Sequence, residues 1–114
     1  MIDLRPDNLE VVKRILAEHV PECEVRAFGS RVTGTAKDYS DLDLTVVGKE
    51  RIGRRRMGRL REAFAESDLP FRVEVQDWHT ISESFQEIIE KQYEVVQKPA
   101  YDPDGGGKCF GEGA

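Results

Sequence analysis

The chain has 114 residues, of which 17 are basic and 22 acidic, so its formal net charge is −5. A chain of this length forms one domain that can bury a core and hold a mononucleotide, without room for a second domain to grip a large substrate. A net-acidic surface repels phosphate backbones, so we expect no direct binding of nucleic acid by the surface as a whole, although a local basic patch could bind it.

The sequence shows no pattern typical of a signal peptide, a membrane span or a disulfide framework. No run of about eighteen apolar residues exists, and acids stand near the N-terminus where a signal peptide would be apolar. We therefore expect a cytoplasmic protein with no membrane contact. Two cysteines, Cys23 and Cys109, are too few for a disulfide scaffold and are interpreted as reduced thiols.

Helical and strand patterns alternate along the chain. Apolar spacing predicts a helix from Pro6 to Val20, with Pro6 in its first turn or Asp7 as its cap. The further predicted elements are a strand at 23–28, a short helical piece after Ser30, a strand at 42–47, a helix at 51–67, a strand at 71–76 and a last helix. The order is that of a small α/β domain of the α+β type.

The last predicted helix opens with the capping box Thr80-Ile-Ser-Glu83 and carries apolar positions up to residue 96. Residues 99–114 follow as a glycine-rich tail without periodicity, which we expect to be disordered. The folded domain is therefore expected to span residues 1–98.

The most informative motif is Asp41-Leu42-Asp43. About four acid-x-acid pairs are expected by chance from this composition, and four occur, so the pair gains its meaning from Gly29-Ser30, which ends the preceding strand ten residues upstream. Alternation places both carboxylates on one strand face, where like charges repel unless a cation lies between them. Asp41 and Asp43 are therefore predicted to hold Mg²⁺, with a solvated strand face as the alternative.

The segment from Gly29 to Gly34 lies where a strand turns into a helix, a place where backbone N–H groups can receive phosphate oxygens. Gly29 permits the tight turn, Ser30 adds a hydroxyl, Arg31 adds a cation, and Gly34 allows a close approach. Alone, such a turn is usually an ordinary loop. Beside a metal pair, these four residues are predicted to bind a nucleotide triphosphate.

A third carboxylate is expected on the next strand. Phe71, Val73 and Val75 alternate with polar neighbours, so Glu74 avoids the core and can join the two aspartates if the strands are adjacent. Asp77 falls on the apolar face or beyond the strand end. Glu74 is therefore preferred as the third catalytic and metal-binding carboxylate, and an exposed edge acid is the alternative.

Six arginines are concentrated between residues 51 and 61. Such a run is usually a solvated helix face, but in a net-acidic chain it can instead mark a partner surface or a landing patch for RNA. The six are Arg51, Arg54, Arg55, Arg56, Arg59 and Arg61.

Gly29-Ser30, ten further residues, Asp41-Leu-Asp43-Leu and then Phe-Arg-Val-Glu74-Val-Gln-Asp-Trp resemble the minimal nucleotidyltransferases of the DNA polymerase beta superfamily. The resemblance covers residues 1 to about 97 and is closest to antitoxins paired with HEPN-domain toxins. It implies that family's fold, a small mixed sheet of three to four strands with helices. It also implies that the Gly-Ser pair binds the triphosphate, that the paired aspartates hold two Mg²⁺ ions, and that Glu74 stands where the family most often has aspartate.

The function implied by this resemblance is transfer of AMP from ATP to a tyrosine hydroxyl of a HEPN RNase toxin encoded nearby, which silences the toxin. Two alternatives stay open. The first is a non-catalytic antitoxin that neutralises its partner by binding alone, with the arginine-rich helix as a contact. The second is a stand-alone transferase acting on a small molecule. A homodimer or a hetero-oligomer is compatible with each.

Overall fold

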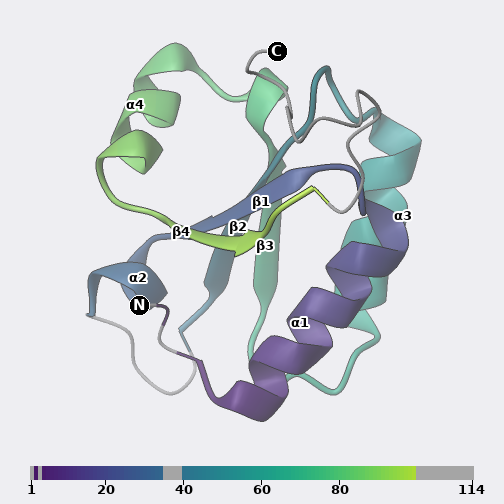
Figure 1. The fold of residues 1–114 in the computed structure, drawn as a ribbon. Coiled ribbons are helices and arrows are strands. Elements are labelled where there is room, and N and C mark those ends of the chain that lie inside the picture. Colours follow the sequence, from purple (N-terminus) through teal and green to yellow (C-terminus); the bar gives the residue numbers. More distant parts are fainter. Residues whose placement is uncertain (1, 3, 35–39, 100–114) are drawn as a thin grey trace.

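The structure is a computed structural model and describes residues 2, 4–34 and 40–99. Four helices, one 3₁₀ turn and four strands follow one another in these segments (Figure 1). In chain order they are α1 (Pro6–His19), β1 (Glu24–Phe28), α2 (Ser30–Thr33), β2 (Leu42–Val47), α3 (Arg54–Ala65), β3 (Val73–Asp77), η1 (Trp78–Thr80), α4 (Glu83–Lys91) and β4 (Glu94–Gln97).

The strands form one mixed sheet in the order β3-β2-β1-β4. β2 and β3 are parallel and are joined through α3, as a parallel pair requires, whereas β1 is antiparallel to both β2 and β4. The predicted α/β class with a small mixed sheet is confirmed, with the larger of the two expected strand numbers.

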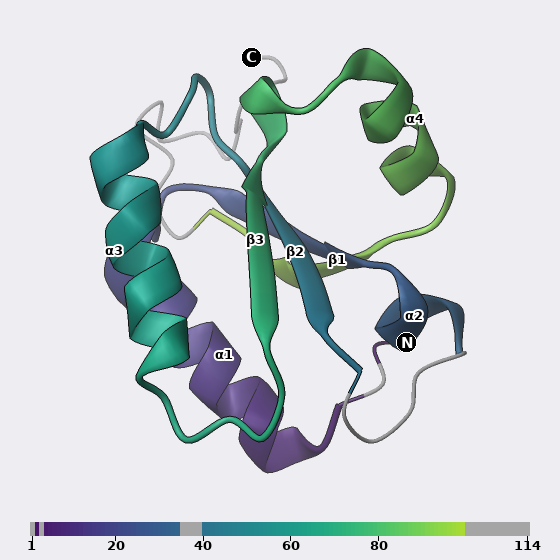
Figure 2. The same cartoon turned by 180° about the vertical axis from the view of Figure 1, so that it is seen from behind.

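The main hydrophobic core lies on one face of the sheet. α1 and α3 lie side by side on that face, while α4 lies on the opposite side (Figures 1 and 2). The core packs fully buried side chains of the strands, such as Val25, Leu42 and Leu44, against Leu16 and Leu60 of the two helices. Since successive strand residues point to opposite faces, the residues between them point away from this core.

Two predicted helix starts are corrected by the structure. α3 begins at Arg54, three residues later than predicted, because Gly53 precedes it with φ +98°, outside the helical region. The capping box at Thr80 is also wrong. Ser82 caps α4 by accepting from the N–H of Phe85, and Thr80 belongs to η1, where its hydroxyl donates to the carbonyl of Asp77.

The last helix is shorter than predicted. α4 ends at Lys91, and residue 96 lies in β4, which adds a strand to the free edge of β1. The apolar positions that looked helical are here strand positions, because pairing with β1 satisfies the backbone of an edge that would otherwise be open. At the other end of the chain, Pro6 occupies the first turn of α1 as predicted.

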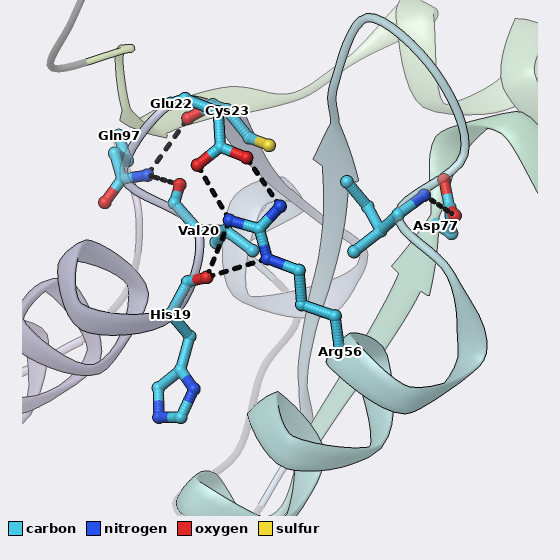
Figure 3. Close-up of polar contacts among 8 residues, drawn as sticks. His19, Val20, Glu22, Cys23, Arg56, Asp77 and Gln97 are labelled. Atoms are coloured by element: carbon cyan, nitrogen blue, oxygen red, sulfur yellow. Dashed lines mark hydrogen bonds and ion pairs between the residues drawn. The ribbon is translucent and has the colours of Figure 1, made fainter.

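The arginine run is partly structural. Arg56 donates to the carbonyl of His19 at 2.9 and 3.1 Å and pairs with the carboxylate of Glu22, which ties α3 to the end of α1 (Figure 3). Hydrogen bonding from this guanidinium lowers the pKa of Glu22. Arg61 donates to the carbonyl of Val75 at 2.8 Å. The other four arginines are exposed.

Cys23 is a free, buried cysteine, in agreement with the predicted reduced thiol, and burial raises its pKa to about 11. Cys109 and the glycine-rich tail from residue 100 lie outside the described residues. None of the helices in the described segments is both long and apolar enough to cross a membrane.

Candidate active site

The three predicted carboxylates lie at neighbouring positions on adjacent strands. Asp43 is in β2 and Glu74 in β3, and the parallel register pairs these two residues directly. Asp41 stands just before β2, exposed, and shares the strand face of Asp43 by alternation. All three therefore belong to the sheet face away from α1 and α3, as expected from the sequence.

The turn after β1 packs against this group. Gly29 has φ +86° and ψ −158°, a region used almost only by glycine, and a Cβ atom there would lie 2.4 Å from Oδ2 of Asp43. Phe28, immediately before it, is the register partner of Asp43. The Gly29-Ser30 turn and the carboxylates thus form one site, although they are separated along the chain.

α2 starts directly at Ser30 and is a single turn closed by bonds from the N–H groups of Val32 and Thr33 to the carbonyl of Gly29. Its short length gives it little dipole. What the turn offers a ligand is close access to backbone and hydroxyl groups beside the carboxylates, because Gly29 carries no side chain.

The charge of Asp43 is unfavourable in this setting. Burial raises the pKa of Asp43, and the carboxylates of Asp41 and Glu74 raise it further. A divalent cation would reverse this penalty by supplying opposite charge to hard oxygen ligands. The donor chemistry and the crowding of negative charge therefore fit Mg²⁺.

The carboxylates are not gathered around one point. Within residues 2, 4–34 and 40–99, no three His, Cys, Asp or Glu side chains form a ready metal-binding group. Glu74 instead pairs with Arg72 at 3.3 Å on the exposed edge. The pair uses one oxygen of Glu74, and an ion pair at an exposed edge contributes little free energy, so it opposes a move of Glu74 toward a metal only weakly.

Asp77, the alternative third carboxylate, has a structural role. It is 4% exposed on the core face, where its oxygens accept from the N–H groups of Ile52 at 2.7 Å and His79 at 3.1 Å. In Figure 3 the dashed line at Asp77 marks the first of these two bonds. Both carboxylate oxygens therefore hold backbone that enters α3 and η1, which supports the preference for Glu74.

Arg31 and Gly34, predicted to bind nucleotide, differ in surroundings. Arg31 is buried, its Nε donates to the carbonyl of Ser40 at 3.0 Å, and its guanidinium lies over the ring of Phe71 at 4.4 Å. These contacts join the turn to the chain before β2. Gly34 ends α2 at φ +89°, and no described residue beyond its chain neighbours lies within 4 Å of where its Cβ would be.

Two aromatic rings that contact Arg26, on the sheet face of the carboxylates, were not predicted from the sequence. Arg26 of β1 lies between the rings of Trp78 and Tyr93, 5.0 and 4.5 Å from their centroids, and pairs with Glu24. Strand alternation in 24–28 places Arg26 on the same face as Phe28, but nothing in the local sequence indicates which rings reach it, because they come from η1 and the chain after α4.

Sequence comparisons relate this chain to known nucleotidyltransferases. Residues 9–103 match the model of the nucleotidyltransferase domain family. The chain is 52% identical, over 97 residues and 85% of each chain, to a Haemophilus influenzae protein described as a probable protein adenylyltransferase, MntA.

Solved structures share the fold. One is a toxin–antitoxin structure with AMP-PNP, at TM-score 0.69 and 22% identity, covering 80% of this chain and 73% of the other. Another is a tri-AMPylated Shewanella oneidensis HEPN toxin in complex with its MNT antitoxin, at TM-score 0.64 and 19% identity, covering 83% and 73%. At these identities the structural matches establish the fold alone.

Proposed function

This chain belongs to the nucleotidyltransferase domain family, and from that premise we propose that it is an antitoxin that transfers AMP from ATP to a tyrosine hydroxyl of a HEPN-domain toxin. The observation that carries the proposal is the packing of Gly29 against Asp43, with Glu74 in register on the next strand. The relative described as a protein adenylyltransferase, at 52% identity, supports a protein acceptor.

In the proposed reaction, Gly29 and Ser30 receive the phosphates of ATP. Arg31 supports their turn from within the protein and Gly34 leaves space at its far end, which are the roles we propose for these two predicted nucleotide-binding residues. The absence of a side chain at Gly29 allows the triphosphate to approach the carboxylates closely.

Asp41, Asp43 and Glu74 would hold Mg²⁺, expected as two ions, which when bound neutralises phosphate charge at the reacting centre. The acceptor oxygen forms a bond to the α-phosphorus while the bond from that phosphorus to the bridging oxygen breaks, and pyrophosphate leaves in line. The hydroxyl proton passes to a carboxylate and then to water. Glu74, exposed enough to turn from Arg72, is the proposed acceptor of that proton.

The test is incubation of the full chain with labelled ATP, Mg²⁺ and the product of the neighbouring gene. The partner should become labelled, and the label should be removed by replacing the acceptor tyrosine with phenylalanine. Asp43→Asn should abolish labelling. Asp68→Asn is a matched control, because Asp68 is an exposed acid in another acid-x-acid pair. Labelling by Asp43→Asn at the wild-type rate would refute the proposal.

The pairing of Glu74 with Arg72 favours one second candidate, an antitoxin that neutralises by binding alone. Survival of cells that express the toxin distinguishes binding alone from AMP transfer. If binding suffices, the double variant Asp41→Asn with Asp43→Asn still protects them from the toxin. If transfer is required, the same variant binds the toxin and fails to protect.

A further inference from the structure

The six arginines around the start of α3 fall into two groups. Arg56 and Arg61 bind backbone carbonyls and a carboxylate of the protein. The other four are exposed and make no hydrogen bond or ion pair to any residue in the described part of the chain. These four are Arg51, Arg54, Arg55 and Arg59.

The positions of these four arginines oppose local helix stability. The first turn of α3 has no acidic residue and no side-chain cap, so Arg54 and Arg55 face the positive end of the helix dipole. Arg55 and Arg59 are also like charges four residues apart on a helix. Charges placed against the helix, without internal partners, indicate a role outside folding.

Two adjacent hollows are lined by these side chains. The larger, about 490 Å³, is lined by Arg54, Arg55 and Arg59, with Arg56, Glu18 and the apolar Ile52. The smaller, about 160 Å³, is lined by Arg51, Arg54 and Arg61, with Asp77 at its wall. Because Gly53 and Arg54 line both, the two hollows are neighbours on the surface.

We propose that this surface, the arginine hollows defined by Arg51, Arg54, Arg55 and Arg59, binds the backbone of single-stranded RNA. A repeating chain of phosphates can occupy both compartments at once, which a lone carboxylate side chain cannot. Guanidinium groups bind phosphate in bidentate fashion and stack on bases. The larger hollow has the size of a small-molecule site, suited to one nucleotide unit of a single strand.

Glu18 favours RNA over DNA within this assignment. It is the one acidic residue among those that line the larger hollow. A carboxylate accepts a hydrogen bond from the ribose 2′-hydroxyl, which DNA lacks. The net charge of −5 repels RNA elsewhere on the surface, so binding would be confined to the hollows.

The arginine hollows are separate from the carboxylate site. They border the start of α3, after the carboxyl end of β2, whereas Asp41 and Asp43 stand at the amino end of that strand. The inference therefore goes beyond nucleotide transfer and can be tested without an acceptor protein.

The experiment measures fluorescence anisotropy of a labelled twelve-nucleotide single-stranded RNA of mixed sequence, titrated with the full chain at several salt concentrations. The test variant is Arg54→Ala, Arg55→Ala and Arg59→Ala together. The matched control removes three exposed lysines that line neither hollow, Lys13→Ala, Lys91→Ala and Lys98→Ala.

The wild type and the control should bind RNA with a dissociation constant that rises steeply with salt. The arginine variant should bind at least about tenfold more weakly at low salt, and its slope of log affinity against log salt should fall by about 2, since each single-strand phosphate contact contributes about 0.7. Its melting temperature should equal or exceed that of the wild type, because the removed charges oppose the helix. A lower melting temperature would show a structural role and overturn the inference.

Three further outcomes would overturn it. One is equal loss of affinity in the arginine and lysine variants, which would mean non-specific attraction. Another is equal binding of DNA of the same sequence. The third is no RNA binding at low salt together with arginine-dependent capture of the neighbouring gene's product, which would make the surface a protein-docking site.

Discussion

Replacing Gly29 with alanine tests whether the turn and Asp43 form one packed site. The backbone of Gly29, at φ +86° and ψ −158°, lies in a region that an L side chain occupies at a cost of about 1–3 kcal/mol. The added methyl would also lie 2.4 Å from Oδ2 of Asp43, far inside van der Waals contact. Asp43 must therefore move.

For a domain of this size, that strain corresponds to a melting temperature lower by roughly 3 to 18 °C, measured by thermal unfolding. Nucleotide transfer per folded molecule should also fall, because Asp43 is displaced from the position that the site requires. Gly58→Ala is the control for both assays, since a Cβ there meets open space within α3 and should stabilise the helix by about 0.5–1 kcal/mol.

Two further variants separate the sources of the penalty. Gly34→Ala has φ +89°, but apart from its chain neighbours no atom of the described residues lies within 4 Å of its Cβ, so it carries backbone strain without a collision of the kind at Gly29. Combining Gly29→Ala with Asp43→Ala removes the colliding oxygen, so the pair should destabilise less than the sum of the single changes. If the destabilisations of the two single variants simply add in the double variant, or if Gly29→Ala melts like the wild type, Gly29 does not pack against Asp43.

Three other groups give predictions of their own. The pKa of Asp43 is raised in the folded protein, so ionisation of Asp43 lowers the free energy of unfolding; this loss begins as pH rises above the usual aspartate pKa and is complete above the higher folded pKa. At pH 7 Asp43→Asn should therefore melt at a higher temperature than the wild type. A lower melting temperature would contradict this. Asp77→Ala removes the acceptor of two part-buried backbone N–H groups and should lower the free energy of unfolding by about 1–3 kcal/mol in chemical denaturation. Glu74→Gln should instead abolish transfer with little change in stability, and the reverse pattern would make Asp77 the third carboxylate. Cys23 is 1% exposed and burial raises its pKa to about 11, so at pH 8 it should react with a thiol reagent only when the protein opens, measured in a Cys109→Ser background. Rapid labelling of the folded protein would show that the thiol is accessible.

The sequence by itself determined the strands that carry the chemistry. β2 occupies Leu42–Val47 as predicted, because three buried apolar residues alternate with positions that point away from the core. The same alternation placed Glu74 off the core face, whereas it left Asp77 either on the apolar face or beyond the strand end, and the structure places Asp77 on the core face. Local periodicity contains this information, since it depends only on which side of one strand is buried.

Only the tertiary structure decided what local pattern cannot encode. Residues 94–97 form a strand because the edge of β1 is free to pair with them, although their apolar spacing continues that of a helix. The division of the arginine run likewise depends on distant acceptors. Arg56 reaches the end of α1 and Arg61 reaches β3. The exposed arginines of the same helix, Arg54, Arg55 and Arg59, make no hydrogen bond or ion pair within the described part of the chain, because partners are set by packing and not by sequence distance.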